Sequence, residues 1–177
     1  MLETLRAAHA KDPALQGIAG YLNAAFYPGV HAIWAHKLSH AFYCRGIPVL
    51  PVAISHLARV FTGVEIHPGA AIGRRFFIDH GIGVVIGETA EIGDDVMLYH
   101  GVTLGGRGFW KDEKGSKRHP TLEDGVVVGV GATVLGPVRI GKKSIIGAGA
   151  LVMSDVPENS RVQPVLAAVM PSKNQPD

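Results

Sequence analysis

An aliphatic residue returns at every sixth position through most of the second half of the chain. The positions in this register are Ile86, Ile92, Leu98, Leu104, Leu122, Val128, Val134, Ile140, Ile146 and Val152. An α-helix repeats every ~3.6 residues and a strand every ~2, so a period of six matches neither element alone. It predicts a prism with three short strands per coil, the aliphatic side chains inside and glycine at many corners. A β-sandwich is disfavoured because its turns would fall at irregular spacings of about 8–12 residues.

The register is broken in two places. An earlier run with the same period lies two residues out of phase, at Ile66, Ile72 and Ile78. The phase changes at Asp79 and His80, two polar residues that are costly to bury without partners, so this corner is a candidate site. The second interruption, residues 105–120, is polar, aromatic and basic, and the register resumes in phase after it. It predicts a loop that extrudes from the prism as a lid.

A carboxylate stands near His80 in the predicted coils. Glu65 precedes His80 by 15 residues, close to one coil of 18, so the two are expected on neighbouring coils within reach of each other. A carboxylate beside a histidine raises the pKa of the imidazole and fixes its tautomer. This arrangement suits a general base.

The segment before the repeat has a different pattern. From Leu22 to Phe42 the apolar residues recur at steps of three and four, which predicts amphipathic helices broken at Pro28-Gly29, and a further helix is expected from Val49 to Phe61. The repeat is expected to end after Val152. The predicted fold class is therefore α+β, mainly β: a helical region over 1–62, a prism over 63–157 with the extruded loop 105–120, and a tail over 158–177.

Composition narrows the class of protein. Hydrophobic residues make up 47% of the 177 positions, too many for a disordered chain, and the net charge of +2 calls for neither nucleic acid nor a membrane surface. Cys44 is the single cysteine, which fits a reducing compartment. The first residues lack the apolar core of a signal peptide, and the apolar stretch 46–54 is too short to span a bilayer. A soluble, cytoplasmic protein is predicted.

Two histidines of the helical region lie four residues apart. His36 and His40 share one helix face, a spacing that can hold a metal, but no third ligand follows at a useful distance. We therefore expect surface or interface histidines and no metal.

Several segments together resemble serine acetyltransferase, the first enzyme of cysteine synthesis in bacteria and plants. They are EIHPGA at 65–70, IGRRFFIDHGIGVVIGETA at 72–90, GVTLGG at 101–106 and KRHP at 117–120. The resemblance extends from about residue 12 to residue 157. Hexapeptide repeats alone would indicate only the wider acyltransferase superfamily, whereas the segment around His80 and the RHP motif are far more specific.

The resemblance implies a left-handed parallel β-helix that forms a homotrimer or a dimer of trimers, with each active site between two prisms. It implies L-serine and acetyl-CoA as substrates, without a metal. His80 would be the general base that takes the proton of the serine hydroxyl, and Glu65 would be its carboxylate partner. Asp79 and Arg118 would hold the substrate's ammonium and carboxylate, an arrangement that discriminates well for an amino acid. His119 and Asp12 would complete the substrate site.

Acetyl-CoA would lie along the groove between prisms. Its amide-rich arm would meet coil backbone at Gly105, Gly106, Val130 and Ala148, and its phosphates would meet Lys143, with Arg139 and Lys142 as further candidates. The last residue is Asp177, where many relatives end in the isoleucine that docks into O-acetylserine sulfhydrylase, so that complex is not predicted. No role is assigned to His100, which stands where many relatives carry glutamine.

Three alternatives remain open at this point. A related acetyltransferase would act on homoserine or on a sugar, and the sequence does not define the side-chain pocket that decides between acceptors. A γ-class carbonic anhydrase would need three histidines converging on zinc, drawn from His67, His80, His100 and His119. A non-catalytic scaffold would leave the polar residues at the register breaks without a purpose.

Overall fold

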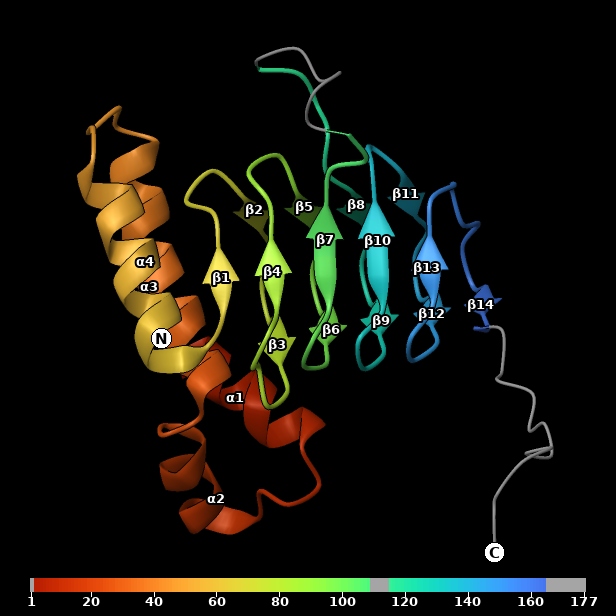
Figure 1. The fold of residues 1–177 in the computed structure, drawn as a ribbon. Helices are drawn as coiled ribbons and strands as arrows, with labels where there is room; N and C mark the ends of the chain where they lie inside the picture. The colour runs from red at the N-terminus through yellow and green to blue at the C-terminus, as the bar shows by residue number, and fades with distance from the viewer. Residues whose placement is uncertain (1, 109–114, 165–177) are drawn as a thin grey trace, which may run out of the picture.

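The computed structural model describes residues 2–108 and 115–164 (Figure 1). Four helices come first: α1 (Leu2–Lys11), α2 (Gly17–Ala24), α3 (Pro28–Tyr43) and α4 (Leu50–Thr62). The strands that follow are β1 (Glu65–Ile66), β2 (Ala71–Ile72), β3 (Phe77–Ile78), β4 (Val85–Ile86), β5 (Glu91–Ile92), β6 (Met97–Leu98), β7 (Thr103–Gly105), β8 (Thr121–Leu122), β9 (Val127–Val128), β10 (Thr133–Leu135), β11 (Arg139–Ile140), β12 (Ile145–Ile146), β13 (Leu151–Val152) and β14 (Arg161–Val162).

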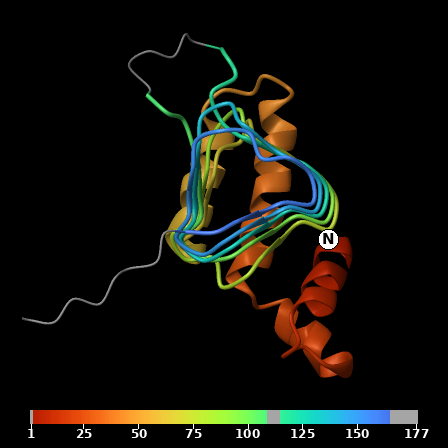
Figure 2. The same cartoon turned by 90° about the vertical axis from the view of Figure 1, so that its right-hand side faces the viewer.

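The strands form a three-sided prism, as the six-residue period predicts. Sheet A contains β1, β4, β7, β10 and β13, sheet B contains β2, β5, β8 and β11, and sheet C contains β3, β6, β9, β12 and β14. From β1 to β10 each strand pairs in parallel with the strand three later in the chain, and β12 pairs with β14, so the coils overlay as stacked triangles when seen along the axis (Figure 2). The fold is a helical block followed by a left-handed parallel β-helix, which confirms the predicted fold class.

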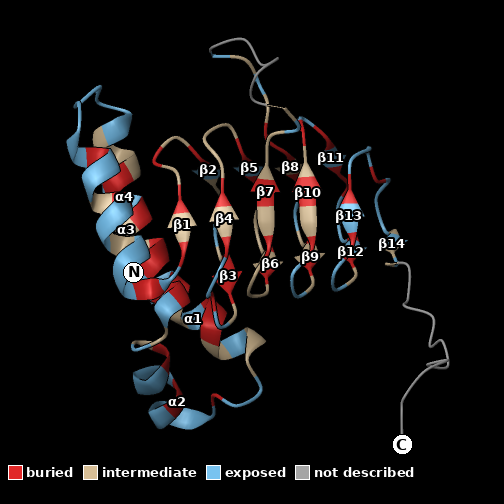
Figure 3. Ribbon diagram, viewed as in Figure 1, coloured by how far each residue is buried: buried red, intermediate tan, exposed pale blue. Residues whose placement is uncertain are grey.

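The interior of the prism is the set of residues that defines the period. Fully buried large side chains include Ile78, Ile86, Leu98, Leu104, Leu122, Ile140 and Ile146. Each lies at an inward position of a strand, and Figure 3 shows these buried positions running along the axis of the prism. One aliphatic side chain per face and coil fills the space, because strand alternation directs its neighbours outward.

Three corners connect the sheets, and each is named after the two sheets that it joins. The AB corner comprises 67–70, 87–90, 106–120 and 136–138; the BC corner comprises 73–76, 93–96, 123–126 and 141–144; the CA corner comprises 79–84, 99–102, 129–132 and 147–150. The long segment of the AB corner contains the predicted lid. Residues 109–114 of that lid lie outside the described residues.

The six-residue register changes phase before Ile86 and after Val152, and the structure shows the cause of each change. Ile66 pairs with Ile86, 20 residues later, because the CA corner at 79–84 contains two extra residues. After Val152 the next inward residue is Val156, four positions on, which bridges to Ile140, and β14 then pairs with β12. The repeat therefore continues beyond Val152, where the sequence pattern was expected to end, on a coil that is two residues short.

The helical block closes one end of the prism (Figure 1). Ser55 of α4 donates a hydrogen bond from Oγ to the carbonyl of Ile66 at 2.6 Å. Gly29 of α3 lies so close to β3 that a Cβ would stand 2.3 Å from the Ile78 carbonyl oxygen, so only glycine fits there. The Lys11 ammonium at the end of α1 donates to the Asp95 carbonyl at 2.8 Å. No helix in the described part of the chain is long and apolar enough to cross a membrane.

His36 is buried where α3 meets the prism, and the expectation of a surface or interface histidine is only half right. Its side chain belongs to the buried set, and its Nδ1 has no hydrogen-bond partner among the described residues. Burial, with a smaller contribution from the nearby His40, lowers the pKa of His36 to about 4. The neutral imidazole is therefore the form that the fold accepts.

This burial predicts a loss of stability in acid. The pKa of His36 in the unfolded chain is about 6.5, above its folded value, so protonation favours unfolding. The free energy of unfolding is retained above about pH 6.5 and falls by about 3 kcal/mol as the pH approaches 4. Urea unfolding of wild type, His36→Gln and the exposed control His56→Gln between pH 4 and 7.5 measures this. His36→Gln should flatten the slope and His56→Gln should keep it; equal slopes in all three would contradict the prediction.

Candidate functional site

The two extra residues of the CA corner carry the polar pair that the sequence singled out. His80 has a φ of 59°, in the left-handed region that few residues other than glycine, asparagine and aspartate adopt. Its side chain is 73% exposed, whereas that of Asp79 is only 19% exposed. The corner thus holds the imidazole out toward solvent, in a backbone conformation of the kind that concentrates at functional sites.

A pocket of about 300 Å³ opens beside this corner. It is lined by Asp12, Tyr27, Pro28, Gly29, Asp79, His80 and Ile82. The structure therefore brings together Asp12, Asp79 and His80, which the sequence placed at one site, and the helical block supplies one wall. Asp79 Oδ2 lies 3.9 Å from His80 Nε2.

Tyr27 is a residue of this pocket that the sequence did not reveal. Its hydroxyl donates a hydrogen bond to Asp12 Oδ2 at 2.7 Å, and the amide of Ala14 donates to Asp12 Oδ1 at 2.8 Å. The bond to Asp12 is the main reason that the pKa of Tyr27 rises to about 12. The only signal in the sequence is its position immediately before the Pro28-Gly29 break.

His100, to which the sequence assigned no role, lies next to His80 in the structure. Its ring lies edge-to-face with the ring of His80, with the centroids 5.6 Å apart. Its Nδ1 is buried and has no hydrogen-bond partner among the described residues. The exposed imidazole of His80 is thus flanked by Asp79 on one side and by a second imidazole from the next coil.

The AB corner holds a second polar group. His119 is buried, and its Nδ1 accepts a hydrogen bond from the Thr89 amide at 3.1 Å, so the ring proton lies on Nε2. Burial, followed by the charge of Arg118, lowers the pKa of His119. Gly87 allows this packing, because a Cβ there would stand 2.1 Å from the His119 ring. The ring is thus a fixed neutral donor.

Arg118 lies beside His119 in an ion pair. Its Nη2 is 2.5 Å from Glu88 Oε2, and Tyr43 of α3 donates to the other oxygen of Glu88 at 3.3 Å. Glu88 is a further residue of this group that the sequence did not single out. The guanidinium retains N–H groups that this bond does not use.

Other predicted site residues are not brought together within one chain. Glu65 pairs with Arg59, Nη1 to Oε2 at 3.0 Å, and no hydrogen bond or ion pair joins it to His80 among the described residues. Its partnership with His80 stays a prediction. Arg118 and His119 lie at the AB corner and His80 at the CA corner, so one chain presents two separate halves of the expected site.

The residues expected at the CoA are also divided between corners. Gly105 and Gly106 lie where the strands of sheet A end, whereas Val130 and Ala148 lie at the CA corner, where those strands begin. Lys143 lies at the BC corner. Of the other basic candidates, Arg139 pairs with Glu123, and Lys142 Nζ lies 3.7 Å from Asp124 Oδ2.

No group of three His, Cys, Asp or Glu side chains that could hold a metal occurs within residues 2–108 and 115–164. This concerns a single chain. The γ-class carbonic anhydrase alternative needs histidines from neighbouring chains.

The family model and the curated relatives that match this chain agree with each other. The family model "Bacterial transferase hexapeptide (six repeats)" matches residues 119–153. The serine acetyltransferase of Mycobacterium tuberculosis is 52% identical over 173 residues, covering 97% of this chain and 72% of the relative. That of Bacillus subtilis is 58% identical, covering 77% of this chain and 61% of the relative. The chain thus spans about three fifths to three quarters of the length of these curated relatives.

Solved structures agree with the sequence relatives. The serine acetyltransferase of Neisseria gonorrhoeae in complex with serine superposes with a TM-score of 0.84 at 39% identity, covering 95% of this chain and 66% of that chain. Serine acetyltransferase 1 of Entamoeba histolytica in complex with L-cysteine gives a TM-score of 0.86 at 40% identity, covering 92% of this chain and 61% of that chain. The similarity therefore includes the helical block as well as the prism.

Proposed function

The chain belongs to the serine acetyltransferase family of acyltransferases, and we propose that it transfers the acetyl group of acetyl-CoA to the hydroxyl of L-serine, giving O-acetyl-L-serine and CoA. The observation that carries this proposal is the pocket at the CA corner. It sets an exposed imidazole, His80, beside the carboxylates of Asp12 and Asp79. An acceptor with both a hydroxyl and an ammonium group meets a base and two anions there.

In the proposed reaction His80 is the general base. Its imidazole takes the proton of the serine hydroxyl as that oxygen attacks the thioester carbonyl, and a tetrahedral intermediate forms. The intermediate collapses with cleavage of the C–S bond, and the CoA sulfur recovers the proton from His80. Holding serine beside the base matters as much as the base itself, because a fixed geometry removes much of the entropic barrier.

The remaining polar residues suit the two ends of L-serine. Asp12 and Asp79 carry the negative charge that an ammonium group needs. Arg118 has unused guanidinium N–H groups for the carboxylate, and its short bond to Glu88 keeps it in place. The Nε2–H of His119 is a donor for the substrate or for the oxygen of the tetrahedral intermediate. This assignment favours an amino acid over a sugar, which has neither charge.

We propose a homotrimer, because the two halves of the site lie at different corners of one prism. The AB corner of one copy, with Arg118 and His119, would face the CA corner of the next, with His80. Exposed apolar side chains support this arrangement: Ile82 of the CA corner, and Val60 and Phe61 near the end of α4, are all more than 70% exposed in the single chain. An apolar surface of this kind is typical of a protein interface.

Acetyl-CoA fits the same groove as a substrate. The coil backbone at Val130 and Ala148 offers amide groups for its pantetheine arm, and a second pocket of about 290 Å³ lies beyond them, lined by residues 149–151 and 162–164. Lys143 has no carboxylate within ion-pair distance among the described residues, whereas Arg139 and Lys142 do. It is the basic side chain best able to meet a phosphate.

The test is release of CoA measured by thiol titration. We expect release that depends on L-serine, with L-homoserine and a galactoside at least about tenfold poorer, because each misplaces its hydroxyl or lacks the paired charges. Release that prefers either alternative acceptor, or that is absent from the folded protein, would contradict the proposed function.

A further inference from the structure

We propose that Tyr27 is a positioning residue that holds the Asp12 carboxylate opposite Asp79 and thereby sets the preference of the enzyme for acceptors with an ammonium group. The inference rests on the proposed function and deepens it, because it names what makes the site select an amino acid rather than a hydroxy acid. Three observations carry it: the hydrogen bond, the anchoring of the tyrosine and the charge of the pocket.

Asp12 needs an external support. It lies in the short connection between α1 and α2, and its carboxylate has two partners among the described residues, the Ala14 amide and the Tyr27 hydroxyl. The Ala14 amide lies in the same connection as Asp12, so it fixes the carboxylate only relative to its own loop. Within residues 2–108 and 115–164, the phenol donates the single hydrogen bond that ties this carboxylate to a residue outside its own loop.

Tyr27 itself is fixed to both the helices and the prism. It is the N-cap residue of α3, and its carbonyl accepts from the Val30 amide at 3.0 Å. Its ring packs on a core cluster that joins Ala24 and Val30 to Phe77 of β3. Since Phe77 is two residues before Asp79, the phenol oxygen has a defined position relative to the second carboxylate.

The charge of the pocket favours a cation. The hydrogen bond to Asp12 raises the pKa of Tyr27 to about 12, with Asp79 adding to the shift, so the phenol stays a neutral donor at any working pH. It orients the Asp12 carboxylate without neutralising it. Each carboxylate keeps lone pairs that its protein partners do not use, and both carboxylates line the pocket, so together they can stabilise an ammonium group placed between them.

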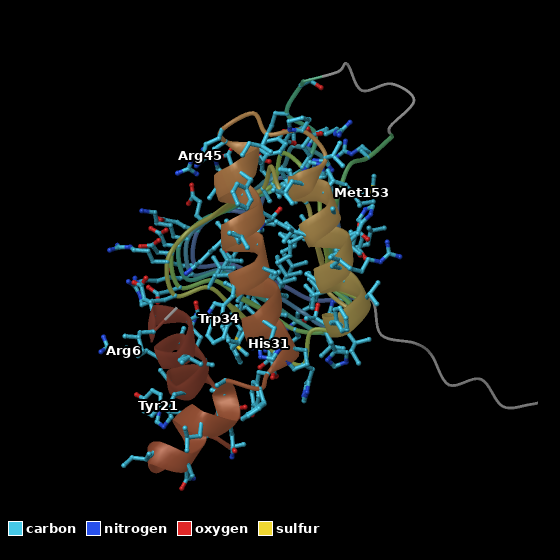
Figure 4. All side chains as sticks on the ribbon, turned by 90° about the vertical axis from the view of Figure 1, so that its left-hand side faces the viewer. Arg6, Tyr21, His31, Trp34, Arg45 and Met153 are labelled. Atoms are coloured by element: carbon cyan, nitrogen blue, oxygen red, sulfur yellow. The ribbon has the colours of Figure 1, made fainter. Side chains whose placement is uncertain are left out.

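The test uses Tyr27→Phe, Asp12→Asn and the double variant, with Tyr21→Phe as the matched control. Tyr21 lies on α2, away from the prism (Figure 4). We expect Tyr27→Phe to raise the KM for L-serine about tenfold, the value of one charge-assisted hydrogen bond, with little change in kcat or in the KM for acetyl-CoA. The double variant should be no worse than Asp12→Asn, because both changes remove the same interaction.

A second acceptor separates positioning from general damage. 3-Hydroxypropanoate has the hydroxyl and the carboxylate of serine but no ammonium group. In wild type and Tyr21→Phe we expect a large ratio of kcat/KM for L-serine over this acceptor, and in Tyr27→Phe a ratio about tenfold smaller. A loosened fold would lower both rates and leave the ratio unchanged.

The outcomes are distinct. An unchanged KM for L-serine in Tyr27→Phe, an unchanged ratio, or additive effects in the double variant would each overturn the inference. If the wild type releases no CoA with L-serine, the proposed function fails, and calorimetric titration of L-serine then decides the inference by itself. An increase in Kd in Tyr27→Phe, absent from Tyr21→Phe, would support it, and equal Kd values would overturn it.

Discussion

Replacing His80 with asparagine is expected to lower kcat for L-serine-dependent CoA release by about 10² to 10⁴-fold, the usual contribution of a general base. Asparagine is the informative substitution because His80 has a φ of 59°, which asparagine tolerates and alanine does not. The backbone of the corner, and with it Asp79 and the pocket, should therefore remain in place. The loss is chemical rather than structural.

The control for this experiment is His56→Asn, an exposed histidine on α4 that does not line the pocket of His80. It should keep the wild-type rate. The KM for L-serine in His80→Asn should change little, because the proposed contacts to the charged ends of serine are made by other residues. A His80→Asn protein with wild-type thermal stability and more than about a tenth of the wild-type kcat would show that another group takes the proton.

The sequence predicts the prism well because its physical basis is local. Each face of a coil needs one inward aliphatic side chain, so aliphatic residues recur every six positions in the sequence, as at Leu98, Leu104 and Leu122. The same logic locates the corner of Asp79 and His80, because two extra residues shift the phase of everything that follows. A site that breaks a regular pattern is visible without coordinates.

What the sequence does not reveal depends on how the helical block packs on the prism. The contact of Tyr27 with Asp12 joins two short segments whose spacing has no period. His36 was expected at the surface or an interface because no third metal ligand follows it at a useful spacing, and α3 is apolar on more than one face, so its pattern does not say which face meets the prism. The end of the repeat was placed too early for a related reason, since the four-residue step from Val152 to Val156 ends the period without ending the coils.

Because the two halves of the site lie at different corners, we expect two inactive variants to recover activity when they assemble into the same trimer. His80→Asn and Arg118→Gln should each be nearly inactive alone, because every site then lacks either its base or its carboxylate ligand. If a site takes His80 from one copy and Arg118 from the next, a trimer that contains both variants has some sites with two intact halves.

Random assembly of equal amounts of the two variants sets the expected fraction of intact sites. A site is intact when the copy supplying His80 carries the Arg118→Gln change and its neighbour carries the His80→Asn change, which occurs in about a quarter of sites. Co-expression of the two variants under different tags, followed by tandem purification, removes the unmixed trimers and leaves about one intact site in three. The purified trimers should therefore regain a substantial fraction of wild-type activity, at least tenfold above either parent. The matched control is His80→Asn co-expressed with a chain carrying both changes, in which no intact site can form. If both halves of the site came from one chain, the mixed trimers would have no more activity than the average of the two parents.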